Sequence, residues 1–125
     1  MSQKVQEKAT TVLVVEDEWL VRETIADFLR AAGWEVVEVA DGEAAVDVLH
    51  TNDAIDVVFT DIRLGRRLSG WDVGEAFRAA HPEMPVIYAS GAVILPERRV
   101  PGSMFFEKPY DPAKVLQACA SLLER

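Results

Sequence analysis

Two patterns of hydrophobic residues alternate along the chain. Short apolar runs that are rich in β-branched residues and closed by turn residues are typical of buried strands, whereas apolar residues three or four positions apart are typical of amphipathic helices. The short runs predict strands at residues 11–15, 34–39, 57–61, 85–89 and 104–106. The helical spacing predicts one helix over 18–32, a second after the Asp41–Gly42 turn, a third that stops before Pro82, and a last one that begins at Asp111.

This alternation of strands and helices predicts an α/β fold, in which helices cover both faces of a parallel sheet. One segment breaks the pattern. Pro96 and Pro101 leave room for about two turns of helix between residues 91 and 102, so the helix expected there is short. Residues 1–10 are polar and are expected to form a flexible tail, which leaves residues 11–125 as one domain.

Composition excludes several classes of protein. Half of the 125 residues are hydrophobic, but no apolar run is long enough to span a membrane. The net charge of -8 argues against direct binding of nucleic acid, because phosphates need a basic surface. Cys119 is the only cysteine, so a disulfide framework and a cysteine metal site are excluded. The polar N-terminus has no signal-peptide core, and we expect a cytoplasmic protein without a membrane partner.

Polar residues with useful chemistry occur where the predicted strands end. They are Glu16 and Asp17 after the first strand, Asp61 at the end of the third, Ser90 after the fourth and Lys108 after the fifth. The carboxyl ends of the strands of a parallel sheet form one edge, and ligands bind at that edge. We therefore expect these side chains to share a site.

With three carboxylates at one edge, either one acid is protonated or a cation lies among them. Two like charges about 4 Å apart repel by about 4 kcal/mol at an effective dielectric constant of about 20, which is a large share of a domain's stability. Oxygen ligands of this kind suit Mg²⁺. The charge of Lys108 and the hydroxyl of Ser90 suit a phosphoryl group that arrives at the metal. The expected chemistry is nucleophilic transfer of a phosphoryl group to a carboxylate, which forms an aspartyl phosphate.

These motifs resemble those of the receiver domains of two-component response regulators. The matching segments are Glu16-Asp17-Glu18, Thr60-Asp61, Ala89-Ser90-Gly91 and Glu107-Lys108-Pro109. They occur in the family's order on successive strand ends, and the resemblance extends over residues 11–124. It implies a flavodoxin-like, CheY-like three-layer αβα sandwich with a five-stranded parallel sheet of order 2-1-3-4-5, here with a shortened fourth helix.

The resemblance also implies roles for the acids. Asp61 would accept a phosphoryl group from a histidine kinase or a histidine phosphotransfer protein. Asp17 and Asp61 would bind Mg²⁺ or Mn²⁺ directly, Glu16 directly or through water, and Arg63 through its backbone carbonyl. Such a domain acts as a signalling switch and is not an enzyme, apart from self-phosphorylation by small donors and slow self-dephosphorylation.

The remaining roles implied by the resemblance fall on the fourth and fifth strands. Ser90 and Lys108 would bind the phosphoryl group, and Phe105 would be the switch aromatic. The sequence departs from the family in three places, and the first is Phe105 itself, which has no hydroxyl. The loop after Asp61 is about one residue longer and carries an unusual Arg66-Arg67 pair, and the interval between Ser90 and Lys108 is about one helical turn shorter.

Three other functions compete with the phosphoacceptor. A pseudo-receiver would bind partners without being phosphorylated, but it would usually have lost an acid or the lysine, and here both are present. A phosphohydrolase could also use Asp61 as its nucleophile. Such enzymes typically place a second acid two residues further on, where this chain has Arg63. A flavin or dinucleotide module is weaker still, because no glycine-rich loop follows the first strand.

Overall fold

The computed structural model describes residues 9–51, 54–91 and 98–124. Its elements are β1 (Thr11–Val15), α1 (Trp19–Ala31), β2 (Glu35–Val39), α2 (Gly42–Thr51), β3 (Val57–Asp61), α3 (Gly70–Ala80), β4 (Val86–Ser90), β5 (Met104–Glu107) and α4 (Pro112–Leu123). The strands form one sheet in the order β2-β1-β3-β4-β5, and every neighbouring pair is parallel. The α/β fold and its expected strand order are confirmed.

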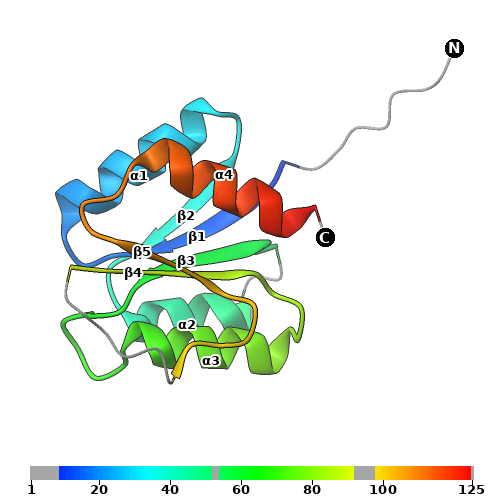
Figure 1. Cartoon of the computed structure of the whole chain (residues 1–125). Coiled ribbons are helices and arrows are strands. Elements are labelled where there is room, and N and C mark those ends of the chain that lie inside the picture. The colour runs from blue at the N-terminus through cyan, green and yellow to red at the C-terminus, as the bar shows by residue number, and fades with distance from the viewer. Residues whose placement is uncertain (1–8, 52–53, 92–97, 125) are drawn as a thin grey trace, which may run out of the picture.

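The molecule has three layers (Figure 1). Helices α1 and α4 cover one face of the sheet, and α2 and α3 cover the other. Successive side chains of a strand point to opposite faces, so the buried strand β3 contributes to both cores. Val58 packs with Phe77 on one side, while Val57 and Phe59 pack with Leu29 on the other. Burial on both faces explains why this strand is a continuous apolar run in the sequence.

The ends of the helices follow from local signals. Gly33 comes just after α1 and has a φ of 95°, a left-handed conformation that glycine adopts without a steric penalty. Helix α3 begins with a capping box, in which Ser69 and Asp72 each accept a hydrogen bond from the other's backbone N–H. Helix α4 begins with Asp111 as its N-cap and Pro112 in its first turn, as the sequence predicted.

Several sequence-based boundaries shift by one residue, among them both ends of α1, the starts of β2 and β4 and the end of β5. Strand β4 ends at Ser90 and not at residue 89, because Ser90 is the register partner of Glu107 on β5. The short helix expected between 91 and 102 falls mainly on residues 92–97, which lie outside the described residues, and residues 98–103 contain no α-helix. Residues 1–8 of the expected tail also lie outside the described residues. Among the helices of the described chain, none combines the length and apolar character that crossing a bilayer would need.

The connection from β3 to α3 brings two backbone segments into close contact. The N–H of Gly70 donates to the carbonyl of Ile62 at 2.8 Å, which folds residues 62–69 back against the end of β3. A Cβ atom at Gly70 would overlap the carbonyl oxygen of Asp61 and crowd the Cα of Ile62. Because only glycine fits here, this contact sets the position of the loop beside Asp61.

Replacing Gly70 tests this constraint. Gly70→Ala should lower the free energy of unfolding by about 2–3 kcal/mol, because the clash is with backbone atoms that cannot rotate away. Urea unfolding followed by tryptophan fluorescence measures the loss. Gly65→Ala is the control from the same loop, since its Cβ would meet only Asp17 Oδ2, at an ordinary 3.5 Å. Equal stability of the two variants would show that the close contact does not constrain the loop.

Candidate functional site

The site lies at the carboxyl ends of the strands, on the left of Figure 1. Strands β1 and β3 are neighbours, and Val15 is the register partner of Thr60. The residues that follow this pair, Glu16 and Asp61, therefore lie side by side. Carboxylate oxygens of Glu16, Asp17 and Asp61 all lie within 4.8 Å of one another. The structure thus brings together the three acids that sequence reasoning placed at one edge.

The three acids have different surroundings. Glu16 is 4% exposed and Asp61 is 7% exposed, whereas Asp17 is open to solvent. Asp61 Oδ1 accepts a hydrogen bond from the N–H of Ile62 at 2.9 Å, and Glu16 Oε2 accepts one from the N–H of Glu18 at 3.1 Å. Glu18 is the N-cap residue of α1 but makes no side-chain cap. Glu16 therefore orders the β1–α1 turn, and neither Glu16 nor Asp17 acts as the side-chain cap of this helix.

Lys108 lies between the two buried acids. Its Nζ atom is 2.7 Å from Glu16 Oε1 and 3.2 Å from Asp61 Oδ2. The backbone N–H of Lys108 donates to the carbonyl of Ser90 at 2.9 Å, so the end of β4 fixes the position of the lysine backbone. The ammonium group offsets the repulsion between the two carboxylates, and it can reach both because β1, β3, β4 and β5 all end at this edge.

Burial changes the acid–base properties of the cluster. Desolvation raises the pKa of Glu16 to about 7, although its hydrogen bond with Lys108 opposes this shift. Desolvation also raises the pKa of Asp61, against the pull of the lysine charge. For Lys108, burial lowers the pKa, but the hydrogen bond to Glu16 and the charges of both acids outweigh it, and the net pKa is raised. The lysine consequently stays charged in neutral solution.

A pocket of about 290 Å³ opens beside Asp61, and Arg63, Ser90, Gly91 and Lys108 complete its lining. Ser90 reaches it from the end of β4, where Ala89 is the register partner of Asp61. A carboxylate, a hydroxyl and an ammonium group therefore face one small space. Their chemistry suits a tetrahedral anion, with an attacking oxygen on one side and hydrogen-bond donors on the other.

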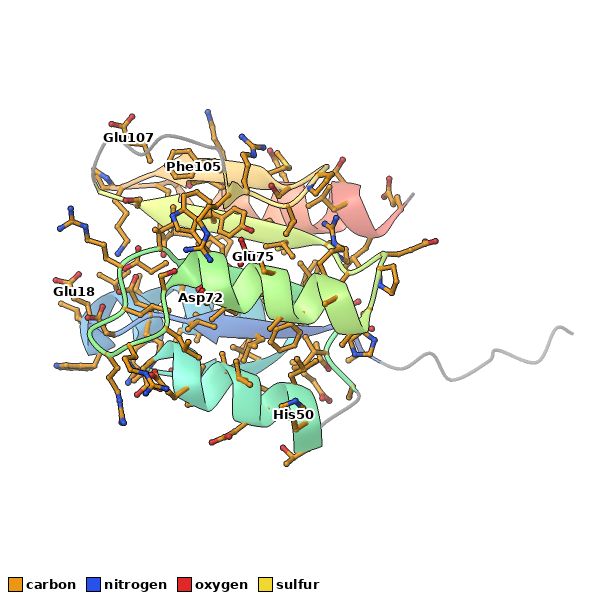
Figure 2. All side chains as sticks on the ribbon, turned by 90° about the horizontal axis from the view of Figure 1, so that it is seen from below. Glu18, His50, Asp72, Glu75, Phe105 and Glu107 are labelled. Carbon is orange, nitrogen blue, oxygen red and sulfur yellow. The ribbon has the colours of Figure 1, made fainter. Side chains whose placement is uncertain are left out.

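Two further sequence-predicted residues lie at the margins of the site. Phe105 is on the edge strand β5, 37% exposed, and Figure 2 shows it with Glu107 along that strand. It is the register partner of Tyr88 on β4. Arg63 follows β3, and its side chain is open to solvent. The switch role of Phe105 and the metal role of the Arg63 carbonyl both stay predictions.

Sequence reasoning missed two residues that support the site. Arg22 on α1 donates from Nη1 to the carbonyl of Glu16 at 2.8 Å and pairs with Glu38 of β2 at 3.4 Å, which ties the acidic turn to the sheet edge. Tyr110 packs edge to face on Phe59, with ring centroids 5.4 Å apart. No motif marks either residue, because Arg22 also needs Glu38 on another strand and Tyr110 needs Phe59 in the middle of the sheet.

A five-stranded parallel sheet of this order, with acids and a lysine at the strand ends, defines a receiver-type domain of the flavodoxin-like class. Comparison with known families agrees. Residues 12–120 match the model of the response regulator receiver domain. The chain belongs to this family of two-component signalling proteins.

Solved structures of receivers are similar along nearly the whole chain. A response regulator receiver protein from Sinorhizobium medicae is 35% identical, with a TM-score of 0.90 over 94% of this chain and 96% of that one. The receiver domain of the hybrid histidine kinase CckA is 32% identical, with a TM-score of 0.75 over 90% of this chain and 98% of that one.

The curated relatives are longer proteins. The probable transcriptional regulatory protein TcrX of Mycobacterium tuberculosis is 30% identical over 119 residues, which are 92% of this chain and 50% of that protein. The response regulator protein FleR of Pseudomonas aeruginosa is 31% identical, over 90% of this chain and 24% of that protein. The chain thus spans half or less of the length of these two relatives.

The raised pKa of Glu16 predicts a pH dependence of stability. The folded protein holds this proton up to about pH 7, whereas the unfolded chain loses it near the ordinary value of 4.5. Because the folded state binds more protons in this interval, its stability falls as the pH rises. Urea unfolding between about pH 5 and pH 8, in the presence of EDTA, should show this fall, and Glu16→Gln should flatten it.

The exposed neighbour provides the control for this measurement. Glu18→Gln also removes one carboxylate from the β1–α1 turn, but Glu18 lies outside the group of acids and is exposed. Its unfolding free energy should follow the parent's pH dependence. If Glu16→Gln and the parent lose stability with the same slope, Glu16 does not hold a proton in the folded metal-free protein.

Proposed function

We propose that this chain is a phosphoacceptor switch, in which Asp61 receives a phosphoryl group from a histidine kinase or a histidine phosphotransfer protein. The observation that carries the proposal is the meeting of three acids with Lys108 at one edge of the sheet. Membership of the receiver family supports it, because phosphoryl acceptance is expected of that family. Residues 11–125 would form the receiver domain, and the proposed location is cytoplasmic, where the ATP that charges such kinases is found.

The donor set fits a hard divalent cation. The three acids Glu16, Asp17 and Asp61 offer only carboxylate oxygens as ligands. Asp17 is exposed to solvent, which leaves room for water ligands. Asp17 and Asp61 would hold Mg²⁺ or Mn²⁺ directly, Glu16 directly or through water, and the Arg63 carbonyl would add a further oxygen. When bound, the cation would offset the negative charge that builds up on a transferring phosphoryl group.

The transfer itself needs a nucleophile and donors. An Asp61 carboxylate oxygen attacks phosphorus, the new O–P bond forms, and the P–N bond of the phosphohistidine breaks. The imidazole leaves with the electron pair of that bond and takes a proton from solvent. Lys108 would turn from the carboxylates to a phosphoryl oxygen, and the hydroxyl of Ser90 would donate to another. In this proposal Phe105 follows Ser90 inward, where it has no hydroxyl to desolvate.

Receiver domains are generally signalling switches, and the features of this site agree with a switch better than with turnover of small substrates. A phosphohydrolase would need a general acid or base near the leaving group, and Arg63 occupies the position two residues after Asp61. A pseudo-receiver is disfavoured because the three acids lie together and Lys108 contacts two of them, Glu16 and Asp61. The likeness to the receiver of a hybrid kinase supports a histidine-based phosphodonor.

The acceptor is tested by removing one charge. Asp61→Asn should lower labelling by acetyl phosphate in the presence of Mg²⁺ at least about a hundredfold, since an amide is a poor nucleophile for phosphorus. Mass spectrometry and sensitivity to hydroxylamine identify the acyl phosphate. Asp47→Asn, on the exposed side of α2, is the control and should label like the parent. An Asp61→Asn protein that labels like the parent would exclude Asp61 as the acceptor.

Metal affinity is tested at the exposed acid. Asp17→Asn should weaken Mg²⁺ binding about tenfold or more, because each lost carboxylate removes both a ligand and a charge. Calorimetric titration gives the dissociation constant without any phosphoryl donor. Glu18→Gln has the same change of charge one residue away and should bind the ion as the parent does. Equal affinities in the two variants would mean that Asp17 is not a metal ligand.

A further inference from the structure

The loop between β3 and α3 is basic in an acidic protein. Residues 62–69, here called the arginine loop, carry Arg63, Arg66 and Arg67, whereas the whole chain has a net charge of -8. These arginines line a groove of about 540 Å³ together with Asp17 and Trp71. Positive charge is thus gathered on one side of the acidic site, and nothing in the proposed phosphoryl transfer uses these three side chains.

The backbone of this loop is held in place. Glu43 Oε2 accepts hydrogen bonds from the backbone N–H groups of Arg67 and Leu68, at 3.1 and 3.2 Å. Leu68 lies so close to Gly42 that a Cβ atom at Gly42 would approach its Cβ to 2.7 Å. The loop is therefore anchored on the first turn of α2. Glu43 thus binds the backbone of the loop through one carboxylate oxygen.

The guanidinium groups of the loop have few ion pairs with described residues and are accessible to a partner protein. Arg66 makes one long ion pair with Asp41, at 3.8 Å, and its side chain is 67% exposed. Arg63 and Arg67 make no side-chain ion pair with any other described residue. Among the described residues outside the loop, arginines bind partners within the protein: Arg98, for example, binds Asp72 and Glu75 of α3, both labelled in Figure 2.

A phosphodonor protein must cover the rim of the site, meaning the loops that surround the pocket beside Asp61. Asp61 is nearly buried, so a phosphohistidine has to reach down to it, and the donor's surface then lies over the loops around the pocket. These loops differ in character. The β1–α1 side presents the acid Glu18 and the exposed apolar residues Trp19 and Leu20, while the β3–α3 side presents the arginine loop. A partner can match both sides in only one orientation.

We propose that the arginine loop binds acidic side chains of the phosphodonor protein, beside its phosphohistidine, and so selects and orients that donor. The inference rests on the proposed function, since it assigns a partner chemistry to the same site. Guanidinium groups bind carboxylates with two parallel hydrogen bonds, which gives both attraction and orientation. Exposed charges of this kind act mainly on the rate of association and on its dependence on salt.

The test uses two synthetic helical peptides that carry the same phosphohistidine. One has glutamates next to it and the other has lysines. The rate at which each peptide labels Asp61 is measured with Mg²⁺ at low and high ionic strength, and each is divided by the labelling rate with acetyl phosphate. The quantity compared between proteins is the ratio of the glutamate rate to the lysine rate.

Arg66→Glu and Arg67→Glu should each lower this ratio about threefold or more at low ionic strength, because each turns an attraction into a repulsion. High salt should shrink the difference. The double variant Ala79→Glu with Ala80→Glu, at exposed positions where α3 ends at the opposite edge of the sheet (Figure 1), makes the same change of net charge and should leave the ratio unchanged. Arg66→Lys, which preserves the positive charge, should keep most of the parent protein's ratio. If the charge reversal in Arg66→Glu lowers the melting temperature, Arg66→Gln replaces it in the comparison. Arg63 is not substituted, because its backbone carbonyl is a proposed metal ligand.

Three results would overturn the inference. If Arg66→Glu and the double variant at Ala79 and Ala80 change the ratio equally, net charge and not the arginine loop decides between donors. If acetyl phosphate labelling falls by the same factor as labelling by the glutamate peptide, the loop binds small anions and not a partner's carboxylates. If no donor labels the parent protein, the phosphoacceptor function itself fails, an outcome separate from the first two.

Discussion

The pairing of Lys108 with the buried carboxylates of Glu16 and Asp61 is the interaction on which the rest of the site depends. Two acids that are almost fully buried beside each other would repel strongly, and burial already disfavours the charge on each. One ammonium group, 2.7 Å from the first and 3.2 Å from the second, makes the arrangement tolerable. The lysine therefore lowers the free-energy cost of burying two acids side by side.

This pairing requires parallel strands. The acids leave the sheet at the ends of β1 and β3, and the lysine leaves at the end of β5, two strands further along the sheet from β3. In a parallel sheet all three strand ends share one edge, so residues that are 92 and 47 positions apart meet there. The core has the same origin, since strands covered on both faces must be apolar except where they end.

The parts of the structure that follow local patterns could be predicted from the sequence. The strand ends placed Glu16, Asp17, Asp61 and Lys108 together, because alternation of strands and helices admits few topologies. Arg22 could not be found in this way. Its role depends on a helix crossing the sheet at one particular place, which no short-range signal records. Glu43 was missed for the same reason, since its partners are backbone groups 24 and 25 residues away.

The same lysine also couples the two binding events expected at this site. Lys108 is the counter-charge of Glu16 and Asp61 in this structure. In the proposed function it would give up this role when the two carboxylates bind a cation. Its ammonium group is then close to the pocket beside Asp61 but has lost its former partners, and a phosphoryl oxygen is the nearest replacement that the chemistry offers. Binding of the cation would thus prepare the lysine for the phosphoryl group. In the proposed function, this one side chain would serve two sets of negative charge in turn.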